Sequence, residues 1–252
     1  MPSLENLSFI TCSARDLIGL KKTLNSFRKS PTFKSEIILV LSNYSRNEIN
    51  QIFQDYQTLN LKIFDKAKSG IYDAMNFGIQ KSTKEFFICL NGGDSLYSIE
   101  NLKKLLSRIQ KNGWGYGAIK MTTNNSNSSN RIYRFNPYSL SLNRFGIKFV
   151  PHPAVVMSKN LAVEIGLFDT KYLIAADQKL FLLASQFKRP FASNSVISEF
   201  SLGGVSSRNS YEITNDFKNI SKEIFGPILN NTKIDDKIWK LVSVCRNTFT
   251  KN

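Results

Sequence analysis

The stretch FFICLNGGDSLY, residues 86–97, combines a buried-strand pattern with two glycines and a single carboxylate. Five apolar residues run without a break from Phe86 to Leu90, as in a strand covered on both faces. Gly92 and Gly93 permit positive φ and the close approach of a backbone or ligand, and Asp94 follows them. Because open α/β sheets bind ligands beyond the carboxyl ends of their strands, the stretch predicts either a ligand site or a plain Asn-Gly-Gly-Asp turn.

Strand and helix patterns alternate on both sides of this stretch. Upstream, apolar runs predict strands at 7–13, 36–42 and 60–65, and helical spacing predicts helices at 17–29, 46–59 and 70–82. Downstream, the patterns predict helices at 98–112, 161–166 and 175–187, strands at 113–121, 131–139, 149–159 and 190–202, and a polar hairpin tip at 122–130. This alternation is typical of an α/β fold with a parallel, doubly wound sheet.

The composition fits a packed globular protein with an unusual charge. The 252 residues are 42% hydrophobic and 12% aromatic, but 34 Lys and Arg outnumber 19 Asp and Glu, for a net charge of +15. Such a surface attracts nucleic acid, anionic lipid or phosphorylated substrates. The basic residues are scattered and no nucleic-acid-binding motif is present, so a solvated basic surface explains most of them and a nucleic-acid partner is not expected.

The cysteines and the N-terminus indicate the compartment. Cys12, Cys89 and Cys245 are far apart and form no CxxC pair, as expected in a reducing environment. The N-terminal residues lack a signal-peptide pattern, and no apolar run is long enough to span a bilayer. We therefore expect a cytoplasmic protein, with peripheral association on the cytoplasmic face of the inner membrane as a further option.

The chain from residue 208 onward is predicted to form a helical extension. Its last segment, residues 233–249, carries apolar residues on one helical stripe with basic residues beside it. Such a helix can lie in a membrane interface or simply pack on its own domain, and the sequence favours neither. The stripe consists of Ile234, Ile238, Leu241, Val242, Cys245 and Phe249, flanked by Lys237, Lys240 and Arg246.

Four sequence features suggest chemistry. Asp73 follows a glycine at a helix start, where free N–H groups suit a phosphate. Asp94 follows a strand and could hold a divalent ion together with diphosphate oxygens. His152 is the only histidine, and Asp177 opens a helix. Each also has a structural explanation: helix capping for Asp73 and Asp177, and a buried, satisfied side chain for His152.

Together, the four features match the needs of transfer from a diphosphate leaving group. A cation offsets the departing charge, and a carboxylate base deprotonates the incoming hydroxyl. The ordered set therefore favours a functional site over four unrelated structural residues.

Five motifs resemble the inverting family-2 glycosyltransferases of GT-A fold, and are closest to the bacterial branch that makes colanic acid, capsular and O-antigen polysaccharides. The resemblance implies a Rossmann-like, mostly parallel sheet flanked by helices. It covers residues 7–207, so we expect a catalytic domain at 1–207 and a helical C-terminal extension at 208–252. The motifs are GIYDAMNFGI (70–79), FFICLNGGD (86–94), HPAVVM (152–157), GLFDTKYLIAADQKLFL (166–182) and ISEFSLGGVS (197–206).

The resemblance also implies roles for individual residues. Asp177 matches the catalytic base and Asp94 the metal-binding acid, for Mn²⁺ or Mg²⁺. His152 lies in the acceptor and diphosphate region, as does the loop containing Gly203, Gly204 and Ser206, which is expected to close over the donor. The residues expected to bind the donor nucleotide or sugar are Thr11, Arg15, Asn43, Gly70, Tyr72, Asp73, Asn76, Asn91, Gly92 and Gly93.

Some positions depart from the family pattern. Leu41 stands where an Asp usually reads the base, so base recognition is expected to pass to Ser42 or Asn43, or the donor is not a uridine nucleotide. Gly93 and Ala176 replace acids, as is common in this branch, and Lys68 replaces an Asp before the GIYDAMN motif.

The expected function is metal-dependent, inverting transfer of a sugar from a nucleoside-diphosphate donor, a UDP-sugar in the first instance. The expected acceptor is a glycan on a polyprenyl diphosphate in bacterial surface polysaccharide synthesis. Two alternatives remain: a non-catalytic scaffold of a polysaccharide assembly complex, and a basic nucleic-acid-binding protein.

Overall fold

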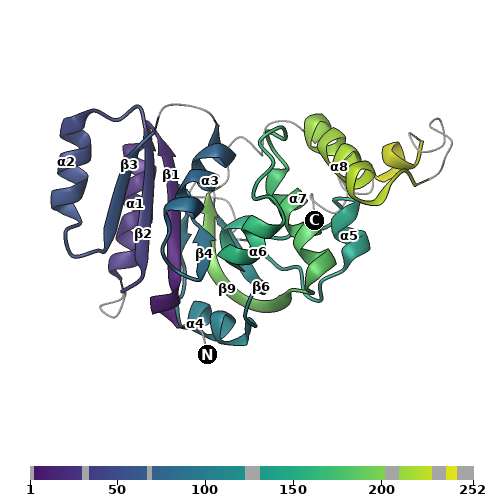
Figure 1. Ribbon diagram of the computed structural model, residues 1–252, viewed down its shortest axis with the longest axis horizontal. Coiled ribbons are helices and arrows are strands. Elements are labelled where there is room, and N and C mark those ends of the chain that lie inside the picture. The colour runs from purple at the N-terminus through teal and green to yellow at the C-terminus, as the bar shows by residue number, and fades with distance from the viewer. Residues whose placement is uncertain are drawn as a thin grey trace.

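The computed structural model describes residues 3–29, 34–66, 70–122, 131–201, 210–228 and 237–242. Within these residues a nine-stranded sheet has the order β3-β2-β1-β4-β8-β6-β9-β5, and β7 pairs with β6 (Figure 1). The strands are β1 (Leu7–Ala14), β2 (Glu36–Ser42), β3 (Leu61–Asp65), β4 (Phe86–Cys89), β5 (Ser95–Leu96), β6 (Trp114–Thr122), β7 (Arg131–Tyr133), β8 (Val155–Ser158) and β9 (Phe191–Ser201).

The sheet is mixed, with its parallel part at the N-terminal end. β3, β2, β1 and β4 are parallel neighbours, whereas β8 runs antiparallel to both β4 and β6. β6 and β9 are again parallel, with register shifts between them. The first four strands therefore direct their carboxyl ends toward one edge, where the α/β principle places a ligand.

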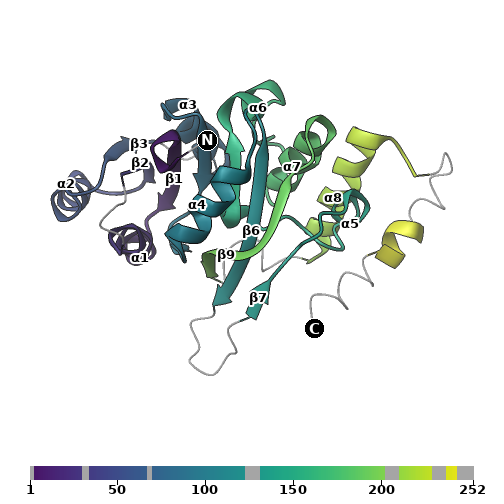
Figure 2. The ribbon, with the colours of Figure 1, turned by 90° about the horizontal axis from the view of Figure 1, so that it is seen from below.

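Helices cover both faces of the sheet. Figure 2 shows α1 and α3 on opposite sides of β1 and β2, and Figure 1 shows α2 and α8 at opposite ends of the molecule. The helices are α1 (Leu17–Arg28), α2 (Arg46–Asp55), α3 (Ile71–Lys81), α4 (Ile99–Arg108), α5 (Leu140–Arg144), α6 (Lys159–Glu164), α7 (Ala176–Phe187) and α8 (Ser210–Phe225), with 3-10 turns at Leu4–Asn6 and His152–Ala154.

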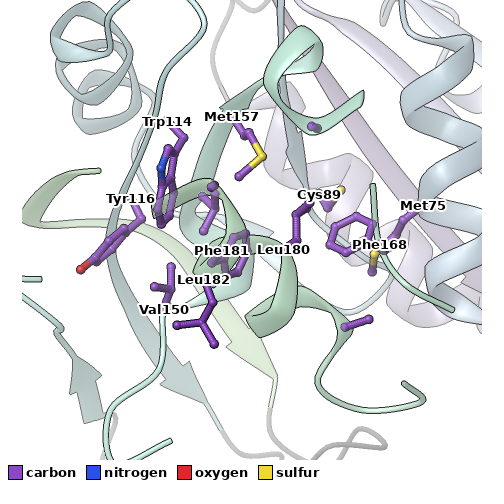
Figure 3. Packing of buried hydrophobic residues seen from close by; sticks show 14 of the residues in the cluster. Met75, Cys89, Trp114, Tyr116, Val150, Met157, Phe168, Leu180, Phe181 and Leu182 are labelled. Atoms are coloured by element: carbon purple, nitrogen blue, oxygen red, sulfur yellow. The ribbon is translucent and has the colours of Figure 1, made fainter. Parts of the chain in front are cut away.

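The predicted continuous apolar runs are buried on both faces. Along β2, Ile37 and Leu39 face one apolar cluster, and Ile38 and Val40 face the other. Figure 3 shows part of the larger cluster, in which the ring of Trp114 stacks on Phe181 at a centroid distance of 5.7 Å. An alternating polar face, as in a half-exposed antiparallel strand, is absent from β2 because helices cover both sides.

Several predicted elements are shorter than expected. The predicted strand 149–159 is a strand only over β8, because Pro151 and Pro153 lack the N–H groups that a ladder needs. The predicted strand 131–139 stops at Tyr133, ahead of Pro137. The predicted helix 98–112 ends at Arg108, although Ser98 caps its start as expected. The polar hairpin tip lies outside the described residues, apart from its first residue.

The C-terminal extension packs against the larger of the two apolar clusters. Phe217 and Ile220 of α8 are buried in the larger apolar cluster. In the helical segment 237–242, Trp239 is 4% exposed and lies 5.5 Å from the ring of Phe145, whereas Leu241 is 69% exposed. The predicted stripe is therefore divided, since Val242 packs against the larger apolar cluster and Leu241 is left in solvent, and the buried Trp239 is not one of its members. Ile234, Cys245 and Phe249 lie outside the described residues.

Candidate active site

The turn after β4 places Asp94 in a buried position at the carboxyl edge of the parallel strands. The N–H of Gly92 donates to the carbonyl of Cys12 at 3.0 Å, which ties the turn to β1. Gly93 has φ 102°, in the left-handed region that favours glycine. A Cβ on Gly92 would lie 3.0 Å from the Ser13 hydroxyl oxygen. Gly93 is therefore needed for backbone conformation, and Gly92 for close approach to β1.

The Asp94 carboxyl is destabilised in its charged form. It is 6% exposed, and burial raises its pKa to about 7, against the opposing effects of the Ser201 N–H and Lys22. No cluster of three or more His, Cys, Asp or Glu residues suited to a metal occurs in the described part of the chain. A single carboxylate can still bind Mg²⁺ or Mn²⁺ when diphosphate oxygens and water complete the shell. Asp94 thus fits a cation that arrives with its nucleotide.

The ends of β1 and β2 carry two strained, exposed residues. Arg15 and Asn43 have φ values of 55° and 61°, and the Arg15 N–H donates to the carbonyl of Ser42 at 3.1 Å. Strained non-glycine backbone of this kind gathers at ligand sites. The Ser42 hydroxyl and the Asn91 amide oxygen are both buried, and neither has a hydrogen-bond partner among the described residues. The structure therefore brings Arg15, Asn43 and Asn91 to the same sheet edge as Asp94.

Thr11 and Leu41 lie inside the sheet rather than at its edge. Thr11 is fully buried, and its hydroxyl donates to the carbonyl of Leu90 at 2.8 Å, which braces β1 against the chain after β4. Leu41 is also fully buried, in the apolar cluster that includes Leu39. Leu41 therefore presents no polar group to a ligand, and the polar residue at the end of β2 is Ser42, one of the two residues expected to take over base recognition.

The start of α3 has no side-chain cap but has an ion pair in its first turn. Gly70, with φ 101°, precedes the helix, and no side chain caps its first N–H groups. Asp73, in the first turn, forms an ion pair with Lys66 rather than capping the helix. Asn76 donates to the carbonyl of Phe168 at 2.8 Å and accepts from its N–H at 2.9 Å. The Asn76 amide thus joins α3 to the segment before α7.

Asp177, Tyr72 and His152 form a second, half-buried group. The Tyr72 hydroxyl donates to Asp177 Oδ1 at 3.3 Å, and His152 Nδ1 lies 3.7 Å from Asp177 Oδ2. Burial raises the pKa of Asp177, with His152 and the Gln178 N–H opposing it. Because the N-cap of α7 is Ala175, Asp177 is not the helix cap.

His152 lies among aromatic rings with its nitrogens unpaired. Its ring centroid is 5.9 Å from that of Phe168 and 6.2 Å from that of Phe181. Both ring nitrogens are buried, and neither has a hydrogen-bond partner among the described residues. Burial lowers the pKa of His152, and Asp177 opposes that effect. His152 is therefore not the satisfied core histidine that the sequence left open.

The sequence analysis missed the residues that support both carboxylates. Thr23 of α1 donates to the carbonyl of Asp94 at 2.6 Å, and Ser201 donates to the carbonyl of Gly93 at 2.7 Å. Gln178 is buried, and its amide makes two hydrogen bonds to the backbone of Val150, near His152. No local motif marks Thr23, Ser201 or Gln178, since their partners are distant in sequence. Gly203, Gly204 and Ser206 lie outside the described residues, as does Lys68.

Comparisons with known proteins agree with this arrangement. Residues 9–162, more than half of the chain, match the model of the family described as Glycosyl transferase family 2. An uncharacterized glycosyltransferase of Mycobacterium tuberculosis is 27% identical over 213 residues, which cover 82% of this chain and 79% of that protein.

Solved structures share the fold at low sequence identity. S. aureus TarS, residues 1–349, in complex with UDP-GlcNAc has a TM-score of 0.67 at 18% identity, over 97% of this chain and 73% of that one. The mannosyltransferase PcManGT of Pyrobaculum calidifontis, in complex with GDP-Man and Mn²⁺, has a TM-score of 0.65 at 12% identity, over 99% and 76%. A longer TarS structure is covered to 42% of its length. The expected α/β fold of GT-A type is therefore confirmed.

Proposed function

The chain belongs to glycosyl transferase family 2, and we propose that it transfers a sugar from a nucleoside-diphosphate donor to a hydroxyl of a lipid-linked glycan. The donor is a UDP-sugar in the first instance, and the pathway is bacterial surface polysaccharide synthesis of the colanic acid, capsule or O-antigen kind. The observation that carries the proposal is the half-buried Asp177 carboxylate, held beside Tyr72 and His152.

Asp177 acts as the general base in this proposal. Its pKa, raised by burial, brings it closer to the operating pH, where a general base is most effective. The Gln178 N–H donates to Oδ1 at 2.8 Å, and the Tyr72 hydroxyl, whose proton is shared with the Ile174 carbonyl, lies 3.3 Å from the same oxygen, so the carboxylate has a fixed orientation. Oδ2 makes no such hydrogen bond in the described part of the chain and is available to the acceptor hydroxyl.

The donor lies at the carboxyl edge of β1, β2 and β4. The residues proposed to contact the nucleotide at this edge are Arg15, Ser42, Asn43 and Asn91. The buried oxygens of Ser42 and Asn91 have no hydrogen-bond partner among the described residues, so a hydrogen bond from the ligand would stabilise them most. A divalent ion, Mn²⁺ or Mg²⁺, held by Asp94 and the diphosphate would offset the charge of the departing nucleoside diphosphate. Solved structures of similar fold contain Mn²⁺ with a nucleotide or nucleotide sugar.

The charge of the chain and the bounds of the resemblance support the remaining assignments. The net charge of +15 favours an anionic surface or an acceptor carrying a diphosphate. Among the described residues, no helix has the length and hydropathy needed to cross a bilayer. We assign residues 1–207 to the catalytic domain and 208–252 to a helical extension, and we place the protein in the cytoplasm at the inner membrane.

The test is thermal stability against UDP, GDP, CDP and ADP, each with Mn²⁺ and with chelator. A ligand specific for the folded state stabilises it by about 2.7 kcal/mol at a hundredfold excess over its Kd. We expect one nucleotide to raise the Tm with Mn²⁺ only, and Asp94→Ala to abolish that rise. Absence of any shift would reject donor binding and favour a non-catalytic scaffold.

A further inference from the structure

A pocket of about 510 Å³, open to solvent and referred to below as the cavity, lies between α8 and the segment that precedes α7. This volume is within the range of about 300–1,000 Å³ that small-molecule sites occupy. α7 and α8 lie side by side in both ribbon views (Figures 1 and 2). The residues that line the cavity are Lys171, Tyr172, Asp216, Asn219, Lys222 and Glu223.

Hydrogen bonds connect the cavity to Asp177. Asp216, in its wall, accepts a hydrogen bond at 3.3 Å from the N–H of Ala175, two residues before Asp177. The single proton of the Tyr72 hydroxyl is shared between the carbonyl of Ile174, at 2.5 Å, and Asp177 Oδ1, at 3.3 Å. The cavity therefore borders the segment that orients the proposed base. None of its lining residues belongs to the donor edge formed by β1, β2 and β4.

Ion pairs fix the wall of the cavity. Lys179 of α7 is only 7% exposed and pairs with both Asp169, at 2.6 Å, and Glu223. Glu223 also accepts from Lys171 at 2.6 Å and from the Tyr172 hydroxyl at 2.8 Å. Burial alone would raise the pKa of Glu223, but these hydrogen bonds hold it at about 2. The wall is therefore organised before any ligand arrives, which reduces the ordering cost of binding.

The chemistry of the lining suits a hydroxyl-rich ligand. Two lysines and two carboxylates balance in charge, so the cavity has no net attraction for an anion. In the described part of the chain, no ion pair or side-chain hydrogen bond engages Asn219 or Lys222, and both are exposed. An amide and an ammonium group, beside the Asp216 carboxylate, offer donors and acceptors to sugar hydroxyls, which can both donate and accept.

We propose that this cavity is an acceptor subsite that binds a saccharide unit of the acceptor, with Asp216, Asn219 and Lys222 as its hydrogen-bonding groups. The inference rests on the proposed function, because it assumes that the acceptor hydroxyl approaches Asp177. It specifies where the acceptor binds and that the bound group is a saccharide, and it gives α8 of the C-terminal extension a direct part in substrate binding.

The test uses the full chain with Mn²⁺ and the nucleoside diphosphate that binds it. Saturation-transfer NMR is run with methyl glycosides of glucose, galactose, mannose, rhamnose, N-acetylglucosamine and N-acetylgalactosamine. We expect at least one to bind, and Asn219→Trp, which fills the cavity, to raise its Kd more than tenfold. Asn215→Trp is the matched control, because Asn215 is an exposed asparagine of α8 that does not line the cavity, and should change the Kd less than twofold.

The nucleotide Kd separates the possible failures. It should be the same in the wild type and both variants, which also verifies folding, and the smaller change Asn219→Ala should weaken saccharide binding in the same direction. Saccharide binding unaffected by Asn219→Trp, or no saccharide binding to a protein that binds nucleotide, would overturn the subsite alone. Absence of nucleotide binding would instead overturn the proposed function.

Discussion

The buried carboxylate of Asp94 and the half-buried carboxylate of Asp177 have neighbours of different kinds, and this difference underlies their proposed roles. Asp94 has backbone N–H groups and the distant Lys22 as its stabilising partners, so an added cation would stabilise its charge most. Asp177 has Tyr72, His152 and the Gln178 N–H, which orient it without neutralising it. Asp94 therefore suits charge binding, and Asp177 suits proton transfer.

At Asp177, replacement by Asn should remove the base while keeping the size and the contact to Tyr72. We expect kcat to fall about 10²–10⁴-fold, the usual contribution of general acid–base catalysis, with an unchanged nucleotide Kd. Transfer assays and nucleotide titration measure the two effects. Asp55→Asn is the control, because Asp55 is an α2 surface residue with a weak pair to Lys21 at 3.5 Å, and it should have wild-type kinetics. Normal turnover in Asp177→Asn would reject the role.

The pH dependence of kcat follows from the environment of Asp177. Because the base must be ionised and burial raises its pKa, activity should fall as pH drops through a value above the ordinary 3.8. His152 opposes the rise, so His152→Gln should move this acid limb to higher pH. The groups that face Asp177 are Tyr72, His152 and Gln178. Burial raises the pKa of Tyr72 and lowers that of His152, so both side chains should be neutral at pH 7. A limb displaced to lower pH in His152→Gln would contradict this account.

Single residues differ in how far the sequence could assign them. Asp94, Gly93 and Asp177 stand at strand or helix ends with local motifs, so their positions could be predicted. Thr23 and Ser201 hold the Asp94 turn from elements 71 and 107 residues away, and such contacts leave no local pattern.

At the scale of elements, one buried acid, Glu36 at the start of β2, holds together β1, β2, β3 and the loop before β4. Glu36 is 1% exposed and accepts from Lys62 and Ser8, each at 2.5 Å, and from Thr83 at 2.8 and 2.9 Å. Burial alone would raise its pKa, but the hydrogen bonds hold it at about 2. Glu36 thus joins β2 to three other segments of the sheet.

Glu36→Gln should lower the free energy of unfolding by about 1–3 kcal/mol at pH 7, since it leaves the buried donors poorly matched. The folded-state pKa lies below the ordinary 4.5, so the stabilisation is present above pH 4.5 and is lost as pH falls toward about 2. Urea unfolding of the wild type and Glu36→Gln at several pH values should show that their difference in free energy of unfolding decreases between pH 4.5 and about 2. Glu100→Gln, at a 67% exposed side chain, should change stability by less than about 0.5 kcal/mol. A difference in free energy of unfolding that is as large at pH 2 as at pH 7 would contradict the stabilising role of the ionised Glu36 carboxylate.

Elements with continuous apolar runs or clear helical stripes could be predicted, whereas those that depend on partners could not. β1 and β2 are where the sequence places them, because burial on both faces leaves a run with few polar residues, and β3, although only half-buried, also lies within its predicted range. The antiparallel direction of β8 has no such signal, since it depends on how the chain returns between β4 and β6. Nothing local to Tyr172 or Glu223 indicates that α8 would close a cavity beside α7.

For the whole molecule, the net charge of +15 and the exposed Leu241 together support the proposed binding to an anionic membrane. Trp239, two residues earlier, is buried against Phe145, so the segment 237–242 is held to the protein with Leu241 directed to solvent. A basic surface contributes about 1 kcal/mol for each Lys or Arg near an anionic bilayer. An apolar side chain that inserts adds to this attraction and does not depend on salt.

Co-sedimentation with vesicles of phosphatidylglycerol and phosphatidylcholine separates the two contributions. We expect the full chain to bind anionic but not neutral vesicles, with binding reduced by salt. Leu241→Ser should weaken binding about tenfold, because burying a leucine contributes about 1.5–3 kcal/mol, and should leave the Tm unchanged. Trp239→Ala should lower the Tm, because Trp239 is buried. If Leu241→Ser and a chain truncated after Lys233 both bind as the full chain does, the basic surface of the catalytic domain would account for the binding, and the C-terminal segment would be a packing element alone.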